Sequence, residues 1–230
     1  MKLRGVSLII PALNEAEAIG PTLRDLPWHL LAECIVVDNG STDATAEEAK
    51  RNGAAVIREP RRGYGRACHS GAQAANRASE VLAFIDGDGS DISSDLVRLA
   101  TPVLTGEADF VIGSRISGRR EPGSMLFSQI FAGWLADKLI RWRLGLMYTD
   151  MGPMRVISRA AFDRMNMSEM TYGWNIEMQI RAAQLGLRVQ EMPTGCRLRR
   201  AGASKVSGSL TASLRAATRI LRVLLRLTVA

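Results

Sequence analysis

Two aspartates one residue apart, Asp86 and Asp88, follow the apolar segment 81–85. An apolar run of this length predicts a buried strand, and side chains two positions apart at a strand end point the same way. Two carboxylates placed like this can bind one hard divalent cation through oxygen. Because such a cation can neutralise a diphosphate, the pair predicts chemistry on a phosphorylated substrate. The alternative at these positions is an ordinary acidic turn after a strand.

The elements that must position this pair are short apolar runs that alternate with helical patterns over the first 113 residues. The runs predict strands at residues 6–10, 34–38, 54–57, 81–86 and 109–113. The patterns between them predict helices at residues 15–26, 42–52, 66–78 and 92–104. This alternation predicts an α/β fold with a mostly parallel sheet covered by helices on both faces.

Polar residues stand at the ends of several predicted strands. They are Asn14-Glu15, Asp38-Asn39, Asp86-Gly87-Asp88 and Ser114-Arg115. Ligands of such sheets bind at the carboxyl ends of the strands. We therefore expect these side chains to converge on one site.

The second half of the chain gives weaker patterns. Residues 118–123 predict a loop, and residues 124–146 predict a long apolar helix that either packs in the core or contacts lipid. A short strand at 154–157, a helix at 174–185 and a strand at 188–191 are expected after it.

Composition limits the class of protein. The 230 residues, 47% hydrophobic and 23% charged, fit one large globular domain. The cysteines Cys34, Cys68 and Cys196 have no metal-ligand spacing and indicate a reducing compartment. The N-terminus lacks the pattern of a signal peptide.

Charge is distributed unevenly along the chain. Residues 192–230 hold eight basic and no acidic side chains, so the net charge of +7 originates in this tail. Such asymmetry predicts an anionic partner, which can be a phosphate, a nucleic acid or a membrane surface.

The tail itself predicts a basic amphipathic helix at residues 209–230, after a main domain at residues 1–208. At about 100° per residue, four arginines fall within an arc of about 60°. They are Arg215, Arg219, Arg222 and Arg226. The helix can lie in a membrane interface with its arginines on anionic headgroups, or pack on the domain with a solvated arginine stripe. No apolar run reaches the ~20 residues needed to span a bilayer.

Two motifs allow a nucleotide-binding interpretation or a purely local one. The glycine-rich bend Gly63-Tyr64-Gly65 lacks the third glycine of a dinucleotide fingerprint, because Cys68 stands there. It still permits close approach of the backbone to a phosphate or a base. Asp38 can accept hydrogen bonds from a nucleobase or ribose, or shape a turn.

Taken together, the motifs have a familiar order. They are Pro11-Ala-Leu-Asn-Glu15, Val37-Asp-Asn-Gly-Ser-Thr-Asp43, Arg62-Gly-Tyr-Gly65, Asp86-Gly-Asp88, Gly113-Ser-Arg115, Thr149-Asp-Met-Gly-Pro-Met-Arg155, Tyr172-Gly-Trp-Asn-Ile-Glu177 and Gly202-Ala-Ser-Lys205. With them the chain resembles the family 2 glycosyltransferases of GT-A fold. Within that family it is similar to the branch of dolichyl-phosphate mannosyl- and glucosyltransferases, over roughly residues 6–208.

The resemblance implies a site for a nucleotide sugar and a metal ion, Mg²⁺ or Mn²⁺. The implied nucleotide-binding residues are Pro11, Leu13, Glu15, Asp38, Gly63, Gly65, Asp86 and Gly87. Asp86 and Asp88 are the implied metal ligands, with Asp88 the main one across the diphosphate. Relatives often have Gln as a further ligand where this chain has Ser90, with Asp91 beside it, so the third ligand stays open.

Glycosyl transfer builds negative charge on the departing diphosphate, so a metal and fixed cations should dominate catalysis. The expected catalytic residues are Asp88, Arg115, Asp150, Glu177 and Lys205. A phosphate acceptor is already anionic at neutral pH and needs only positioning. The residues expected to bind such a phosphate are Arg115, Arg200, Ser204 and Lys205.

A hydroxyl acceptor would need a carboxylate base, for which Asp150 and Glu177 are the candidates. Their structural alternatives are a helix cap for Asp150 and a helix-surface charge for Glu177.

The predicted function is inverting, metal-dependent transfer of a hexose from a UDP- or GDP-linked sugar to a polyprenyl phosphate. The expected location is the cytoplasmic face of the cell membrane, as a peripheral protein. The nearest alternative is a transferase of the same fold acting on a hydroxyl of a soluble or lipid acceptor. A nucleic-acid partner is disfavoured, because the body is neutral and no aromatics interleave with the tail arginines. The Asp86 and Asp88 pair argues against a non-catalytic relative; oligomeric state stays open.

Overall fold

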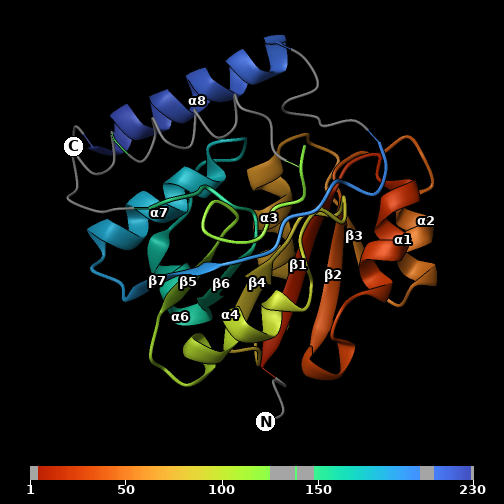
Figure 1. The fold of residues 1–230 in the computed structure, drawn as a ribbon, viewed down its shortest axis with the longest axis horizontal. Helices are drawn as coiled ribbons and strands as arrows, with labels where there is room; N and C mark the ends of the chain where they lie inside the picture. Colours follow the sequence, from red (N-terminus) through yellow and green to blue (C-terminus); the bar gives the residue numbers. More distant parts are fainter. Residues whose placement is uncertain (1–4, 125–137, 139–147, 203–209, 229–230) are drawn as a thin grey trace.

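A mixed sheet flanked by helices forms the centre of the molecule (Figure 1). The computed structural model describes residues 5–124, 138, 148–202 and 210–228. Within these residues seven strands form the sheet. They are β1 (Val6–Ala12), β2 (Glu33–Asp38), β3 (Ala55–Arg58), β4 (Val81–Phe84), β5 (Phe110–Ser114), β6 (Arg155–Ser158) and β7 (Val189–Pro193). Their order across the sheet is β3-β2-β1-β4-β6-β5-β7, and only β6 among them is antiparallel to its neighbours.

Helices cover both faces of this sheet, as the sequence predicts. One face packs against α1 (Ala16–Arg24), α2 (Thr45–Arg51) and α4 (Asp95–Leu104). The other packs against α3 (Tyr64–Ala74), α6 (Arg159–Met165), α7 (Trp174–Gln184) and α8 (Leu210–Thr228). A short 3₁₀ turn, η1 (Trp28–Leu30), precedes β2.

The alternation of side chains along β1 explains these two layers. Leu8 and Ile10 enter the core with α1, α2 and α4, whereas Ile9 enters the core on the opposite face. All seven residues of β1 are buried. A strand buried on both faces needs a continuous apolar sequence, which is why the N-terminal run predicted it.

The predicted α/β fold is confirmed, and the element boundaries differ by a few residues. One helix, α6, was not expected from the sequence; Ser158 caps it by accepting a hydrogen bond at Oγ from Ala161 N at 3.2 Å. The strand predicted at 154–157 is β6, inserted between β4 and β5. The apolar helix predicted at 124–146 falls almost wholly outside the described residues.

Helix α8 confirms the predicted amphipathic tail helix and alters the interpretation of its arginines. Val223, Leu224 and Leu227 are buried in the core that α7 shares. Arg219 pairs with Glu169, in the segment before α7, and Arg226 pairs with Glu177, on α7 itself. Both carboxylates are buried. The arginine stripe is therefore not uniformly solvated. No described helix has the length and apolar content needed to cross a membrane.

Candidate active site

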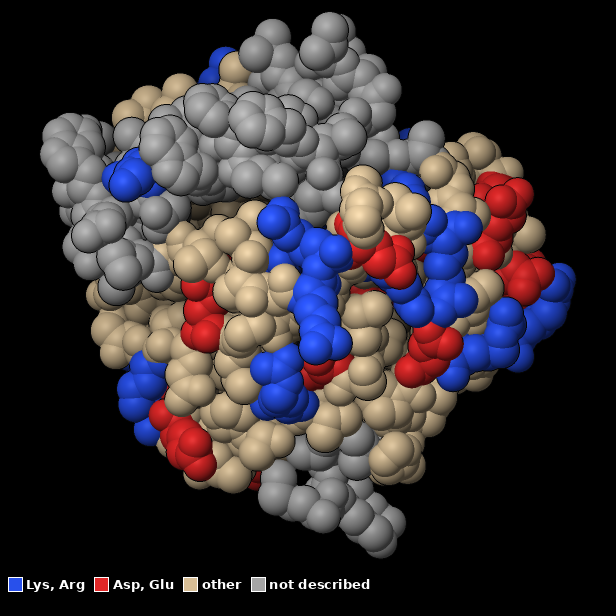
Figure 2. Space-filling model, in the orientation of Figure 1, with Lys and Arg blue, Asp and Glu red and all other residues tan. Residues whose placement is uncertain are grey.

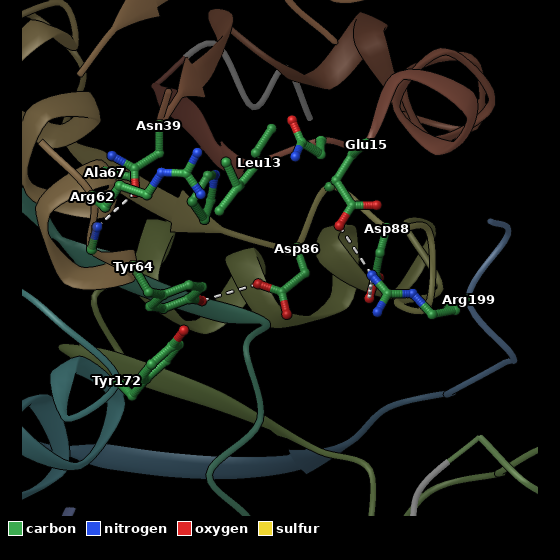
Figure 3. Close-up of a pocket in the computed structure, with 15 residues that line it drawn as sticks. Leu13, Glu15, Asn39, Arg62, Tyr64, Ala67, Asp86, Asp88, Tyr172 and Arg199 are labelled. Atoms are coloured by element: carbon green, nitrogen blue, oxygen red, sulfur yellow. Dashed lines mark hydrogen bonds and ion pairs between the residues drawn. The ribbon is translucent and has the colours of Figure 1, made fainter. Parts of the chain in front are cut away.

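A cavity of about 480 Å³ opens at the carboxyl ends of β1 and β4 (Figure 3). It brings together residues from β1, the turn after β2, the start of α3, the turn after β4 and the segment after β7. Its lining is Pro11, Ala12, Leu13, Asn14, Glu15, Asn39, Arg62, Gly63, Tyr64, Ala67, Asp86, Gly87, Asp88, Tyr172 and Arg199. Six of the predicted nucleotide-binding residues lie here: Pro11, Leu13, Glu15, Gly63, Asp86 and Gly87.

The Asp86 and Asp88 pair lies in the middle of this cavity (Figure 3). Asp86 Oδ1 accepts a hydrogen bond from the Tyr64 hydroxyl at 3.1 Å. Burial, and then repulsion from Asp88 and Asp91, raises the pKa of Asp86 well above its ordinary value. Asp91, whose Oδ2 accepts from Asp86 N at 3.1 Å, has a pKa raised to about 7, chiefly by burial. Asp86 and Asp91 are thus buried carboxylates that repel each other and Asp88.

This donor set fits a magnesium or manganese ion. Asp86 and Asp88 supply oxygen ligands, and the ion would offset both the burial and the repulsion that raise the pKa of Asp86. The described residues contain no cluster of three or more acidic, histidine or cysteine ligands. Mg²⁺ is commonly bound by one or two carboxylates together with substrate phosphates and water, so two protein ligands suffice.

Arg199 is a charged cavity residue that the sequence did not predict for the site. Its Nη2 lies 3.0 Å from Glu15 Oε1 and 3.2 Å from Asp88 Oδ2. Arg200, which the sequence analysis selected, does not line the cavity; its guanidinium pairs with Asp25 instead. The backbone N of Arg200 donates to Asp88 O at 3.0 Å and so holds the segment after β7 across the turn after β4. The cluster of basic residues at 197–200 indicates a positively charged segment, but the sequence does not show which of its side chains points into the cavity.

Two predicted nucleotide-binding residues lie outside the cavity lining. Asp38 is buried, and its Oδ1 accepts from Ser41 N at 2.9 Å, so it shapes the turn after β2. Gly65 packs so tightly that an added Cβ would lie 2.4 Å from Glu169 O.

The turn after β2 is fixed by Asn39. Its Nδ2 donates to Glu59 O at 2.9 Å and to Arg61 O at 2.8 Å, while its Oδ1 accepts from Gly63 N at 2.8 Å. Asn39 therefore joins β2, the residues after β3 and the start of α3 into one wall of the cavity.

Arg115 and Asp150 pair with each other and do not line this cavity. Arg115 Nε and Nη2 donate to Asp150 Oδ2 and Oδ1 at 2.8 and 2.9 Å. Burial disfavours the charged guanidinium, but these hydrogen bonds outweigh it and leave the pKa of Arg115 above its ordinary value. The helix-cap alternative for Asp150 is wrong, because its carboxylate is engaged by Arg115.

Glu177 is fully buried on α7, so its interpretation as a helix-surface charge is wrong. Its carboxylate accepts hydrogen bonds from Ser168 N and Oγ and from Glu169 N, at 3.0, 2.8 and 2.6 Å. It does not line the cavity. Ser204 and Lys205 lie outside the described residues.

A second cavity, of about 760 Å³, is rich in arginine. Arg98, Arg119, Arg120 and Arg197 line it, together with Asp95 and Glu121. Arg197 borders this cavity and Arg199 the first one, so the segment after β7 lies between the two. Figure 2 shows basic side chains gathered near the centre of the face in view, with acidic side chains beside them.

Comparison with known proteins gives consistent matches. Residues 7–165 match the model of the family described as Glycosyl transferase family 2. The chain is 38% identical to an uncharacterized glycosyltransferase of Mycobacterium tuberculosis over 211 residues, which cover 91% of this chain and 93% of that protein. It is 33% identical to the undecaprenyl-phosphate mannosyltransferase of Micrococcus luteus over 221 residues, covering 89% and 88%.

Among solved structures, the fold is similar to glucosyl-3-phosphoglycerate synthase of Mycobacterium tuberculosis in complex with Mn²⁺, UDP and glucosyl-3-phosphoglycerate. The TM-score is 0.78 at 25% identity, and the match covers 98% of this chain and 80% of the synthase.

Proposed function

Because this chain belongs to the family 2 glycosyltransferases, we propose that it moves a hexose from a nucleotide sugar to a polyprenyl phosphate, using Mg²⁺ or Mn²⁺. The observation that carries the proposal is the convergence of Asp86, Asp88 and Glu15 in one cavity large enough for a nucleotide. The cavity also contains the cations Arg62 and Arg199 and the aromatic rings of Tyr64 and Tyr172.

In this proposal the cavity binds the donor along its length. The Asn39 turn and Leu13 would hold the nucleoside, and Asp86 and Asp88 would hold the metal ion that the diphosphate needs. When bound, the metal withdraws electron density from the leaving diphosphate. Arg199 lies beside Asp88 and adds a fixed positive charge where negative charge develops.

The chemical step is a single displacement at the anomeric carbon. An oxygen of the acceptor phosphate forms the new bond as the bond to the nucleoside diphosphate breaks, so the configuration inverts. A phosphate oxygen is already ionised near neutral pH, so no protein base is required. The burial of Glu177 and the pairing of Asp150 with Arg115 favour this acceptor over a hydroxyl.

The arginine-rich second cavity supports an anionic acceptor, because it borders the same segment that carries Arg199. The similarity to an undecaprenyl-phosphate mannosyltransferase supports a lipid phosphate. A soluble phosphorylated acceptor is the second candidate, since the similar synthase of known structure binds glucosyl-3-phosphoglycerate.

We also propose that the protein binds an anionic membrane surface at the cytoplasmic face. Leu221 and Leu225 are exposed on α8, beside the exposed Arg222. Apolar and basic side chains together on one helix face suit a membrane interface. Co-sedimentation with anionic liposomes, and no retention on DNA, is the expected result; equal binding to neutral vesicles would contradict it.

A thermal-shift panel of UDP- and GDP-sugars, with and without Mn²⁺, tests donor binding. A ligand at a hundred times its Kd adds about 2.7 kcal/mol to stability, so the true donor should raise Tm clearly. Transfer of labelled hexose is then measured with polyprenyl phosphate, polyprenol and 3-phosphoglycerate. Transfer to polyprenyl phosphate alone is expected. Transfer to 3-phosphoglycerate or polyprenol instead would show that polyprenyl phosphate is not the acceptor. If no nucleotide sugar bound in a metal-dependent way, the whole proposal would be overturned.

A further inference from the structure

Helix α8 is attached to the body through a buried carboxylate. Arg219 Nε lies 3.0 Å from both oxygens of Glu169, and its Nη2 lies 2.9 Å from Oε2. Burial alone would raise the pKa of Glu169, but hydrogen bonds from Arg219 and Thr171 outweigh it and leave that pKa below its ordinary value. Removing Arg219 would therefore leave an ionised carboxylate buried without its main countercharge.

The same carboxylate shapes the turn that follows it. Thr171 donates its backbone N–H to Glu169 Oε1 at 3.0 Å, and its hydroxyl donates to the same oxygen. The carbonyls of the turn then accept the first N–H groups of α3. Gly65 N donates to Thr171 O at 3.2 Å, and Arg66 N donates to Met170 O at 2.9 Å. A helix start leaves such N–H groups without intrahelical partners, and α3 has no side-chain cap, so this turn caps it.

Two glycines make this contact possible and close. A Cβ on Gly65 would lie 2.4 Å from Glu169 O, and one on Gly63 would lie 2.2 Å from Met170 O. Only glycine lets the two backbones come this close, and the hydrogen bonds from Gly65 N and Arg66 N hold them together. The start of α3 is therefore directly joined to this turn.

Both sides of this junction line the cavity that contains Asp86 and Asp88, which is the donor cavity of the proposed function. Gly63 and Tyr64 do so from the start of α3, and Tyr172 does so just after the turn. Figure 3 shows the rings of Tyr64 and Tyr172 together on one side of the cavity, with the Tyr64 hydroxyl directed at Asp86.

We propose that Arg219 and Glu169 are positioning residues for the donor site. By fixing the cap of α3 they fix Tyr64 against Asp86, so a helix with no described residue in the cavity lining sets the affinity for the donor. The nature of the ligand, a nucleotide sugar with its metal, rests on the proposed function.

The test compares Arg219→Ala, Arg219→Lys and Glu169→Gln with Arg188→Ala as a matched control. Arg188 also pairs at two points with Asp109, at 3.1 and 2.7 Å, but this pair is more exposed and lies at the opposite end of the sheet. Donor affinity is measured by calorimetry with Mn²⁺, and the exchange protection of the Gly65 and Arg66 amides is measured by hydrogen exchange. Steady-state kinetics separate KM from kcat.

Arg219→Ala and Glu169→Gln should weaken donor binding and raise KM by at least about fivefold, with a smaller effect on kcat. The Gly65 and Arg66 amides should lose protection in both variants, and Arg219→Lys should recover part of each effect. Arg188→Ala should change neither quantity.

Equal donor affinity and equal amide protection in Arg219→Ala and Arg188→Ala would overturn the inference. If the unaltered protein bound no nucleotide sugar, the proposed function would fail, and amide protection at Gly65 and Arg66 would then decide the inference alone.

Discussion

The guanidinium of Arg115 donates hydrogen bonds to both carboxylate oxygens of Asp150, and the backbone N of Arg115 donates to the same carboxylate at 3.0 Å. Asp150 is buried and Arg115 is mostly buried. This pair fixes the end of β5 to the residues that precede β6. Both residues were expected to act on the substrate, and their mutual pairing gives them a measurable structural role.

Asp150→Asn should therefore reduce stability. The change leaves the Arg115 cation buried without its countercharge, which typically costs about 3–5 kcal/mol. Urea unfolding at neutral pH measures the loss. A variant with unchanged stability but a lower kcat and a shifted pH–rate profile would instead identify Asp150 as a base.

Asp88→Asn should abolish most turnover while preserving the fold. Among the described residues this carboxylate pairs with the half-buried Arg199 at 3.2 Å, so the variant should still fold, whereas metal binding depends on the carboxylate. Loss of one charge-stabilising group of this kind lowers kcat by about a hundredfold or more. Turnover in Mn²⁺ is compared with turnover in chelator; equal rates for unaltered protein in both would remove the metal from the mechanism.

Tyr64→Phe should raise the Mn²⁺ concentration needed for half-maximal activity. The hydroxyl orients Asp86 Oδ1, and a hydrogen bond to a charged group contributes about 1.5–3 kcal/mol. Tyr148→Phe is the control, because that hydroxyl donates to Gln179 O, away from the cavity lining. The same metal requirement in both variants would show that Tyr64 does not orient Asp86.

Glu59 predicts a pH dependence of stability. Hydrogen bonds from Arg61 lower the pKa of Glu59 from 4.5 to about 2 in the folded protein. Its contribution is therefore complete above pH 4.5 and is lost as the pH falls through 2.

Glu59→Gln should be less stable at pH 7 and should lose less stability on acidification over this window. Chemical denaturation at a series of pH values measures both curves. Parallel curves for the two proteins would exclude Glu59 as the titrating group.

The sheet and the placement of its polar ends could be predicted from the sequence because each depends on local patterns. An apolar run followed by Asp86 and Asp88 already locates the end of β4. The position of β6 could not be predicted, since its pairing with β4 and β5 depends on contacts far apart in the chain.

The sequence also could not predict which charged side chains point into the cavity or the core. Arg199 and Arg200 are adjacent and chemically identical, yet only Arg199 reaches Glu15 and Asp88. Periodicity on α8 grouped Arg219 with its neighbours, but its carboxylate partner, Glu169, lies 50 positions earlier. Such pairings follow from tertiary packing, which no single segment encodes.

The position of β6 has a consequence for how the chain acquires its structure during synthesis. Phe84, at the end of β4, pairs with Arg155, which the ribosome adds 71 residues later. Until then β4 has an open edge, and long-range pairings of this kind form slowly. A nascent chain that already contains every residue from Pro11 to Asp88 therefore still lacks β6, the strand that pairs with the free edge of β4. We expect the N-terminal and C-terminal halves of the sheet to fold together, after synthesis has passed β6.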